Sequence, residues 1–491
     1  MENDMFQLAS ARILAGAARE DIAPPLGIYS RCWGASLHET ASSVHHPFTV
    51  TAAALQSAEG DGLPHVVLAV DLCWFEETEN SRFLEQVRAA TGLGEDQLVV
   101  NLGHSHAALN LSFSLSDKPG GDKIIPYFNQ VVERSISAVH AALAAMQPAW
   151  LTADYGHCSL AVNRNYVDDV SGEVLCGFNP LEAADDTLVY ARVAADDGTP
   201  IAAFLNYGCH PTTLGPANEA LSTDYIAAAR ATVEDAFGGL CLFLIGACGD
   251  TAPREGYSGD TRTADSNGRQ LGYATASVAE SLLPPGEALG YAGPMLSGAT
   301  LATWERCKMD PAAVSGVHSA RLDIELPLRA KVDAEVLAQR ERDCRDRLAA
   351  AESSGDALAI RNATAMAERA RRNVLREPLL PSGDALTLSV WVWQFGRVAF
   401  VAMPAEPFGD LQTAIRAQFP ELCIIIAMNS NGTCGYLMPR EHYGRGLYQE
   451  WASPTGKGGF ERMRDAIVGQ LAAWKTGRQA HPAPTKMTRS P

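Results

Sequence analysis

Short apolar runs that alternate with amphipathic stretches are the feature that most constrains the fold of this chain. Helical periodicity is present at residues 80–91 and 127–146. Strands that alternate with helices are typical of layered α/β proteins, in which helices cover the faces of a sheet. The sequence therefore predicts an α/β fold of layered, mixed and mostly parallel sheets flanked by helices. The apolar runs with the length of buried strands span residues 65–72, 97–102, 201–207, 240–245, 398–402 and 423–427.

Two segments differ from this pattern. Residues 332–376 are rich in Ala, Arg, Glu and Leu and are interrupted by Ser353-Ser354-Gly355-Asp356, which predicts a helical-hairpin insertion over about 331–376. Residues 476–491 contain three prolines and few apolar side chains, so a disordered tail is expected there. The remainder, residues 1–475, is predicted to form one catalytic domain that contains the insertion.

Charge and composition exclude several classes of partner. The net charge is −18 and the basic residues are scattered, so nucleic acid is not expected to bind. No window approaches the roughly 18 to 20 apolar residues of a membrane anchor. The N-terminus lacks the features of a signal peptide, and eleven cysteines without CxxC spacing indicate reduced thiols. We therefore expect a cytoplasmic protein that acts on a small molecule, and a homo-oligomer remains possible.

Polar side chains follow five of the predicted strands. In open α/β sheets, binding sites lie just outside the carboxyl ends of the strands. Several separate strand ends therefore predict one shared site. The residues at these ends are His104 and His106 after 97–102, His210 after 201–207, Asp250 after 240–245, Glu406 after 398–402 and Tyr436 after 423–427.

The pair His104 and His106 favours a metal site. If the strand continues through them, residues i and i+2 point to one face and both imidazoles enter one pocket. Two histidines, a carboxylate and a phenol form a donor set that suits Zn²⁺. A different interpretation stays open for each residue. The histidines could be satisfied polar residues near a core, Glu406 could cap a helix that starts near Phe408, and Tyr436 could be a packing residue.

Residues 103–107, Gly-His-Ser-His-Ala, nearly match the G-x-S-x-G nucleophile elbow, with Ala in the last place. The elbow requires a helix immediately after its serine, whereas residues 108–121 have the composition of a loop. Ser105 would also point away from both histidines in a continued strand. A serine hydrolase of the α/β-hydrolase type is therefore disfavoured.

Ordered motifs along residues 12–460 resemble those of the neutral, non-lysosomal ceramidase family. The resemblance implies that family's catalytic fold, a Zn²⁺ cofactor and cleavage of an amide bond. Several blocks in the correct order are more specific than any one of them. The matching blocks are residues 16–25, 101–106, 206–211, 249–253, 404–406 and 435–448.

The resemblance also implies a role for particular residues. His106 would act beside the metal as a proton donor or a stabiliser of an oxyanion. Arg164 and Tyr448 match family residues near the reactive centre. Asp250 lies in the matching Gly-Asp block and is placed with the catalytic residues, although a turn role is the alternative. The implied zinc ligands are His104, His210, Glu406 and Tyr436.

Two departures from the family pattern change the expected chemistry. The family's catalytic serine falls on Ala252, whose methyl group cannot attack a carbonyl. Too few residues follow Tyr448 for the family's C-terminal immunoglobulin-like domain, so we expect the catalytic domain without it. Ceramide itself is therefore not the expected substrate.

Three functions remain open from the sequence. The first is a zinc-dependent hydrolase that cleaves an amide, ester or lactone bond in a small soluble molecule by attack of metal-bound water. The second is a zinc-dependent sugar lyase or glycoside-cleaving enzyme. The third is a non-catalytic binding protein on the same scaffold, which is disfavoured because a buried polar cluster is costly without a use.

Overall fold

The computed structural model describes residues 5–477, and its largest unit is an eight-stranded sheet. The sheet contains all four strands predicted before residue 300, each within two residues of its predicted ends. The predicted α/β class is confirmed. Most of the predicted tail, residues 476–491, lies outside the described residues. The strands, in spatial order, are β14 (Leu240–Ile245), β12 (Pro200–Tyr207), β11 (Thr187–Ala195), β7 (Gln147–His157), β2 (Ala9–Asp21), β4 (Thr49–Ser57), β5 (His65–Val70) and β6 (Leu98–Leu102).

A second sheet of four strands packs face to face against the first. Buried aromatic side chains from both sheets fill the space between them, and the rings of Phe204 and Phe400 meet edge to face with centroids 5.2 Å apart. This shared core fixes the two sheets relative to each other. The strands of the second sheet, in order, are β18 (Val317–Pro327), β19 (Ala385–Phe395), β20 (Val398–Ala402) and β22 (Cys423–Ala427).

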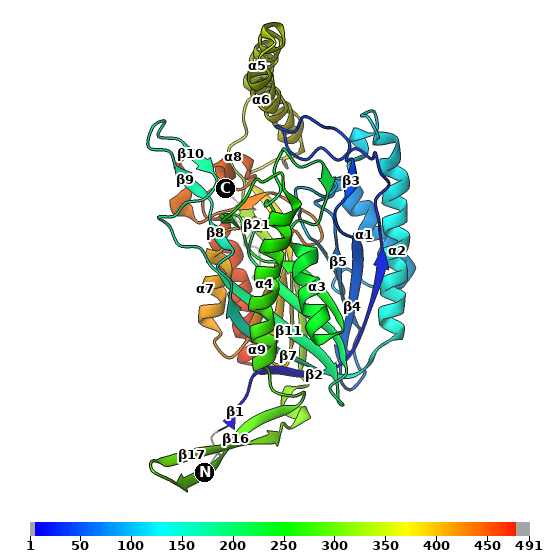
Figure 1. The fold of residues 1–491 in the computed structure, drawn as a ribbon, viewed down its shortest axis with the longest axis vertical. Coiled ribbons are helices and arrows are strands. Elements are labelled where there is room, and N and C mark those ends of the chain that lie inside the picture. The colour runs from blue at the N-terminus through cyan, green and yellow to red at the C-terminus, as the bar shows by residue number, and fades with distance from the viewer. Residues whose placement is uncertain (1–4, 478–491) are drawn as a thin grey trace, which may run out of the picture.

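Helices cover the outer faces of both sheets (Figure 1). Their apolar sides form further core clusters with the outward-facing side chains of the strands, so the body is built as helix, sheet, sheet and helix layers. The helices on the larger sheet are α1 (Glu77–Thr91), α2 (Ile124–Ala144), α3 (Ile226–Phe237) and α4 (Thr261–Ser281), and those on the smaller sheet are α7 (Asp410–Gln418) and α9 (Gly459–Lys475).

The prediction of mostly parallel sheets is wrong. Only β5–β6 and β12–β14 are parallel in the larger sheet, and only β20–β22 in the smaller one. Each parallel pair is a strand, helix, strand unit whose strands are continuous apolar runs, which is why these strands were visible in the sequence. The centre of the large sheet is antiparallel, and two of its strands, β2 and β4, are rich in alanine.

Two elongated elements project from the layered body at opposite ends (Figure 1). One is the pair of helices α5 (Ala334–Ser354) and α6 (Ala357–Arg376), whose first turns are capped by the carboxylates of Asp333 and Asp356. Gly355 ends α5 in the left-handed conformation, at φ 70°. The other is the hairpin of β16 (Glu287–Leu296) and β17 (Thr300–Lys308), which pairs with β1 (Met5–Phe6).

Buried asparagines join the carboxyl ends of the strands in the two sheets. The Asn101 side chain donates to the Met428 carbonyl over 2.6 Å and accepts from the Ile245 amide over 3.2 Å. Asn206 donates to the Ile426 carbonyl over 2.7 Å. These bonds satisfy backbone groups that would otherwise be unpaired in the core. They also hold the carboxyl ends of β6, β12, β14 and β22 close together.

None of the helices within residues 5–477 combines the length and the apolar character that a membrane crossing requires.

Candidate metal centre

The loop after β6 carries His104 and His106, but not in the predicted extended conformation. The strand ends at Leu102, and His104 has φ 62°, in the left-handed region that non-glycine residues seldom adopt. The prediction that the two histidines share a strand face is therefore wrong. The sharp turn nevertheless brings their rings together, edge to face with centroids 5.2 Å apart. Backbone strain of this kind is concentrated at functional sites.

Three buried donor atoms converge beside this turn. Oε2 of Glu406 lies 3.6 Å from Nε2 of His104 and 3.3 Å from Nε2 of His210. Within residues 5–477, none of these three atoms has a hydrogen-bond partner. The opposite ring nitrogens are held by backbone carbonyls, Nδ1 of His104 by Cys73 over 3.2 Å and Nδ1 of His210 by Cys248 over 2.8 Å. This is the arrangement that metal-ligating histidines adopt, so the residues fit a bound cation.

Backbone pairing places Glu406 next to Tyr436. Glu406 lies in the short strand β21 (Glu406–Pro407) and is directly opposite Tyr436 of β23 (Tyr436–Leu437) in a parallel pair. Helix α7 begins at Asp410 with Gly409 as its N-cap and without a side-chain cap. Glu406 therefore does not cap this helix, and the alternative interpretation of this residue is wrong.

His106 adds a third imidazole to the group. The ring nitrogens of His104, His106 and His210 lie within 4.8 Å of one another. His106 packs against Trp33 and Trp74, with ring centroids at 5.0 and 6.0 Å, and its Nε2 has no partner in the described chain. Burial and the neighbouring imidazoles lower the pKa of His106 well below its usual value. Burial, assisted by Arg164, lowers the pKa of His210 to about 4. Both rings are therefore neutral at neutral pH.

Arg164 connects the polar residues on the other side of the group. It follows β8 (Ala161–Asn163), which pairs with β15 (Thr251–Pro253). The buried guanidinium donates twice to the Gly249 carbonyl, over 2.7 and 3.2 Å, and once to the Tyr436 hydroxyl, over 3.1 Å. Ala252 is buried in β15 opposite Val162.

Asp250 and Tyr448 lie at the edges of this arrangement. The Asp250 carboxylate accepts from the Gly409 amide over 2.8 Å, and burial raises the pKa of this carboxyl to about 6. Its side chain thus joins the end of β14 to the start of α7. Tyr448 begins α8 (Tyr448–Ala452), and its ring centroid lies 5.8 Å from that of Tyr436. The catalytic roles of Asp250 and Tyr448 stay predictions.

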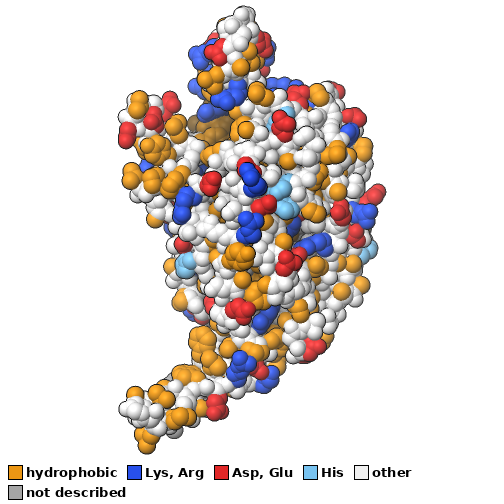
Figure 2. All heavy atoms as spheres, in the orientation of Figure 1, with side chains coloured by type: hydrophobic (Ala, Val, Ile, Leu, Met, Phe, Trp, Pro, Cys, Tyr) orange, Lys and Arg blue, Asp and Glu red, His pale blue; other side chains and the backbone are white. Residues whose placement is uncertain are grey.

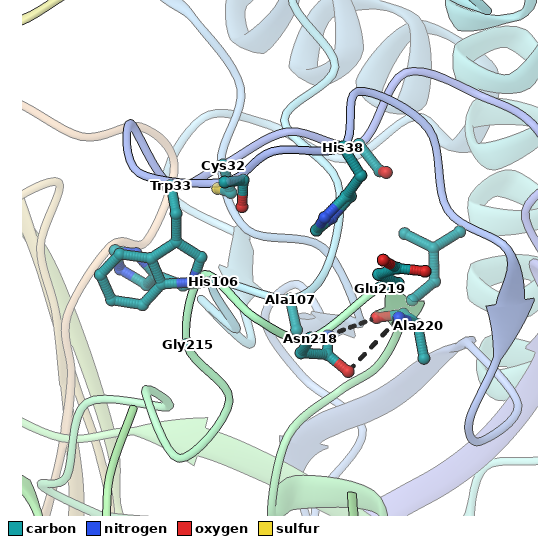
Figure 3. Close-up of a pocket in the computed structure, with 12 residues that line it drawn as sticks. Cys32, Trp33, His38, His106, Ala107, Gly215, Asn218, Glu219 and Ala220 are labelled. Carbon is teal, nitrogen blue, oxygen red and sulfur yellow. Dashed lines mark hydrogen bonds between the residues drawn. The ribbon is translucent and has the colours of Figure 1, made fainter. Parts of the chain in front are cut away.

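Two cavities flank the site. One, of about 10 Å³, is lined by Trp33, His106, Gly215 and residues 218–221 among others (Figure 3), and the Asn218 side chain bonds both backbone groups of Ala220 beside it. A space of this size holds no more than about one water molecule. The other, of about 300 Å³, is lined by Val174, Arg369, Tyr448 and Trp451 among others. Only the second has room for a small substrate, and it reaches the site at Tyr448.

Several residues around the site were missed or given no role in the sequence analysis. Trp33 and Trp74 lie outside the matched blocks, and no sequence pattern predicted that they would pack against His106. Asn429 lies two residues after the end of β22, is buried at φ 49°, and both of its amide atoms lack partners within residues 5–477. Buried Gln449, next to Tyr448, donates to the Gly249 carbonyl. Proximity to the strand end and to Tyr448 was the available signal for these two.

Comparison with known proteins shows which solved structures share this fold. The chain matches no protein-family model and no curated protein sequence. The crystal structure of neutral ceramidase from Pseudomonas aeruginosa superposes with a TM-score of 0.67 at 14% identity, covering 96% of this chain and 76% of that one. A ceramidase complexed with C2 superposes with a TM-score of 0.65 at 14% identity, covering 98% and 78%. The chain therefore has the fold of the neutral ceramidases, as the ordered motifs predicted.

Proposed function

We propose that this chain is a zinc-dependent hydrolase that cleaves an amide, ester or lactone bond in a small molecule. The observation that carries the proposal is the convergence of Nε2 of His104, Nε2 of His210 and Oε2 of Glu406. All three atoms are buried and lack partners among the described residues. Leaving such groups unpaired costs several kcal/mol in total, at about 1 to 3 kcal/mol each, unless a cation occupies the space between them. Amide cleavage is favoured because the fold is that of the neutral ceramidases.

His104, His210, Glu406 and Tyr436 would hold the ion. Neutral imidazoles, a carboxylate and a phenol oxygen are the donor types that Zn²⁺ takes in catalytic sites. When bound, zinc lowers the pKa of water from 15.7 to about 7 and polarises a carbonyl. Burial and the charge of Glu406 raise the pKa of Tyr436 well above its usual value, so the phenol keeps its proton without the ion.

The other residues supply proton transfer and electrostatic stabilisation. The free Nε2 of His106 can take a proton from the attacking water and return it to the leaving amine or alcohol. Trp33 and Trp74 shield this nitrogen from bulk water. Arg164 holds Tyr436 in position and adds positive charge where a carbonyl oxygen would become negative. Ala252 offers no nucleophile, which supports direct hydrolysis over a covalent intermediate.

The cavity of about 300 Å³ beside Tyr448 supports a small substrate. Its lining combines apolar Val174, Leu447 and Trp451 with charged Arg369 and Glu450. This mixture suits a molecule with one apolar and one polar end.

The test combines metal analysis with activity. Purified protein is assayed on a panel of small N-acyl, ester and lactone substrates, before and after chelation, and products are identified by mass spectrometry. Glu406→Ala and His210→Ala should lose zinc and lower kcat/KM by at least about 10³-fold. His157→Ala, at an exposed His–Asp pair, is the matched control. Retained turnover in both site variants after chelation contradicts the proposal. An unsaturated product would identify a lyase instead.

A further inference from the structure

A second group of metal-type ligands lies outside the candidate centre. His45 and His46 follow β3 (Ser43–Val44), and Asp265 lies in the second turn of α4. Nε2 of His46 is 2.7 Å from Oδ1 of Asp265, and Nε2 of His45 is 3.3 Å from the same oxygen. The three donor atoms lie within 4.8 Å of one another. Figure 2 shows histidine side chains at the surface of the face that carries α3 and α4.

The orientation of the two rings is unusual for neighbouring residues. In an extended chain, adjacent side chains point to opposite faces. Here the chain bends directly after β3, so both rings lie on the same side, with centroids 4.0 Å apart, and both Nε2 atoms meet one carboxylate. One carboxylate needs only one histidine as a partner, as the pair of His157 and Asp186 shows. Convergence of two imidazoles on one oxygen is the geometry of a ligand set.

The ring of His45 is also held through its other nitrogen, Nδ1. Its Nδ1 lies 3.0 Å from the Ser222 hydroxyl, which in turn accepts from the Asp224 amide over 2.9 Å. A partner on the far nitrogen is what orients a metal-ligating histidine, and here it directs Nε2 of His45 toward Asp265. The side chains of His45, His46 and Asp265 are 11%, 30% and 26% exposed, so the remaining coordination positions are open to water.

We propose that His45, His46 and Asp265 form a second divalent-cation site, with Zn²⁺ as its ion. Two imidazoles and one carboxylate suit zinc better than magnesium or calcium, which prefer oxygen donors. The proposal uses none of the ligands of the candidate centre and therefore does not depend on the proposed function.

Hydrogen bonds connect this site to the loop that carries His104 and His106. The His45 amide donates to the Leu221 carbonyl over 2.8 Å. The next residue, Ser222, donates its amide to the Ala107 carbonyl over 3.0 Å and accepts from the Ser105 hydroxyl over 2.7 Å. A cation held between β3 and α4 would thus stabilise the segment on which the strained turn at His104 rests. Its role is structural.

Zinc stoichiometry tests the proposal directly. The full chain is stripped with chelator, reloaded with Zn²⁺, desalted and analysed by mass spectrometry. If both sites bind, wild type holds two ions per chain, His46→Ala and His210→Ala hold one each, and the double variant holds none. His157→Ala should hold two. If His46→Ala does not lower the count in either the wild-type or the His210→Ala background, the proposal is overturned. Failure of the candidate centre alone gives a different result, one ion in wild type and none in His46→Ala.

A thermal measurement covers the case in which a variant folds poorly. In the His210→Ala background, added Zn²⁺ should raise Tm by at least about 2 °C, because a ligand that binds only the folded state stabilises it. Asp265→Asn, which keeps the shape of the side chain, should abolish this shift. An equal zinc-dependent shift with and without Asp265→Asn would overturn the proposal, because zinc would then bind the folded chain without Asp265 as a ligand.

Discussion

At the scale of single residues, Arg164 links the Gly249 carbonyl to the Tyr436 hydroxyl within the candidate centre. Its guanidinium bonds the Gly249 carbonyl through two nitrogens and the Tyr436 hydroxyl through one of them. A lysine ammonium is a point donor and cannot reproduce this planar, forked geometry.

Arg164→Lys is therefore expected to lower kcat/KM by about 10²-fold, the effect of losing one donor that stabilises developing charge. Zinc content should stay at the wild-type level, because Arg164 is not a proposed ligand. Steady-state kinetics and metal analysis of the same preparation check this. Arg254→Lys, at an exposed arginine bonded to the Ser159 carbonyl, is the control. An unchanged kcat/KM in Arg164→Lys would contradict the proposed role.

Asp250 carries a prediction about stability and pH. Burial raises the pKa of its carboxyl from 3.8 in a free side chain to about 6. The folded state therefore holds this proton at pH values where the unfolded state has lost it. The contribution of this proton to the free energy of unfolding is therefore complete below about pH 4. It is lost as the pH rises through about 6.

Asp250→Asn removes this titration and keeps an oxygen that can accept from the Gly409 amide. The free energy of unfolding of wild type minus that of the variant should fall by about 3 kcal/mol between pH 4 and pH 7. Urea denaturation of chelated protein at both pH values measures the difference. A difference that is constant with pH would show that Asp250 is ionised in the folded protein throughout this range.

At the scale of elements, the helical pair α5 and α6 has few ties to the body. Within these two helices, Leu337 and Ala370 are the buried residues. Figure 2 shows basic side chains on and below this projection. Arg369 of α6 stacks on Trp451 with its guanidinium carbon 4.1 Å from the ring centroid, beside the larger cavity. The ion pair of Arg329 and Glu377, at 2.7 Å, closes the base of the projection.

Replacement of residues 334–376 by a short Gly-Ser linker should leave the fold intact, with Tm changed by a few degrees at most. KM should rise about tenfold with little change in kcat, because one wall of the cavity is lost and the reacting groups are untouched. Arg369→Ala should reproduce part of the rise in KM, and Arg347→Ala, on the exposed side of α5, should not. An unchanged KM after the replacement would show that the substrate does not bind in the cavity beside Tyr448.

The strands that the sequence predicted most accurately are continuous apolar runs. Strands β14, β20 and β22 begin and end at the predicted residues, because each is a continuous apolar run of strand length. Helix α1 begins three residues before its predicted start, at Glu77, because its first turn is acidic rather than apolar. The antiparallel strands β2 and β4 did not stand out in the sequence, because their alanine-rich segments contain few of the β-branched and aromatic residues that mark a strand.

At the scale of the whole molecule, the candidate centre depends on the alignment of two sheets. Asn206 bonds the Leu244 carbonyl of its own sheet and both backbone groups of Ile426 in the other sheet. Asn206→Ala leaves these buried backbone groups unpaired and should lower the free energy of unfolding by about 2 to 4 kcal/mol.

Urea denaturation measures this loss, and zinc titration should show weaker binding because β12 and β22 carry ligands on their following loops. Asn362→Ala, on the exposed surface of α6, should change stability by less than about 0.5 kcal/mol. Equal stability of the two variants would show that Asn206 does not join the sheets.

The sequence by itself determined the α/β class and the positions of six buried strands, four of which precede His104, His210, Glu406 and Tyr436. These follow from local hydrophobic patterns and from motif order, which the chain carries without reference to its fold. Only the tertiary structure decided the antiparallel centre of the large sheet, the left-handed turn at His104, and the meeting of His45 and His46 with Asp265. Each of these depends on contacts between residues far apart in the chain, and the free energy of such contacts overrides local preference.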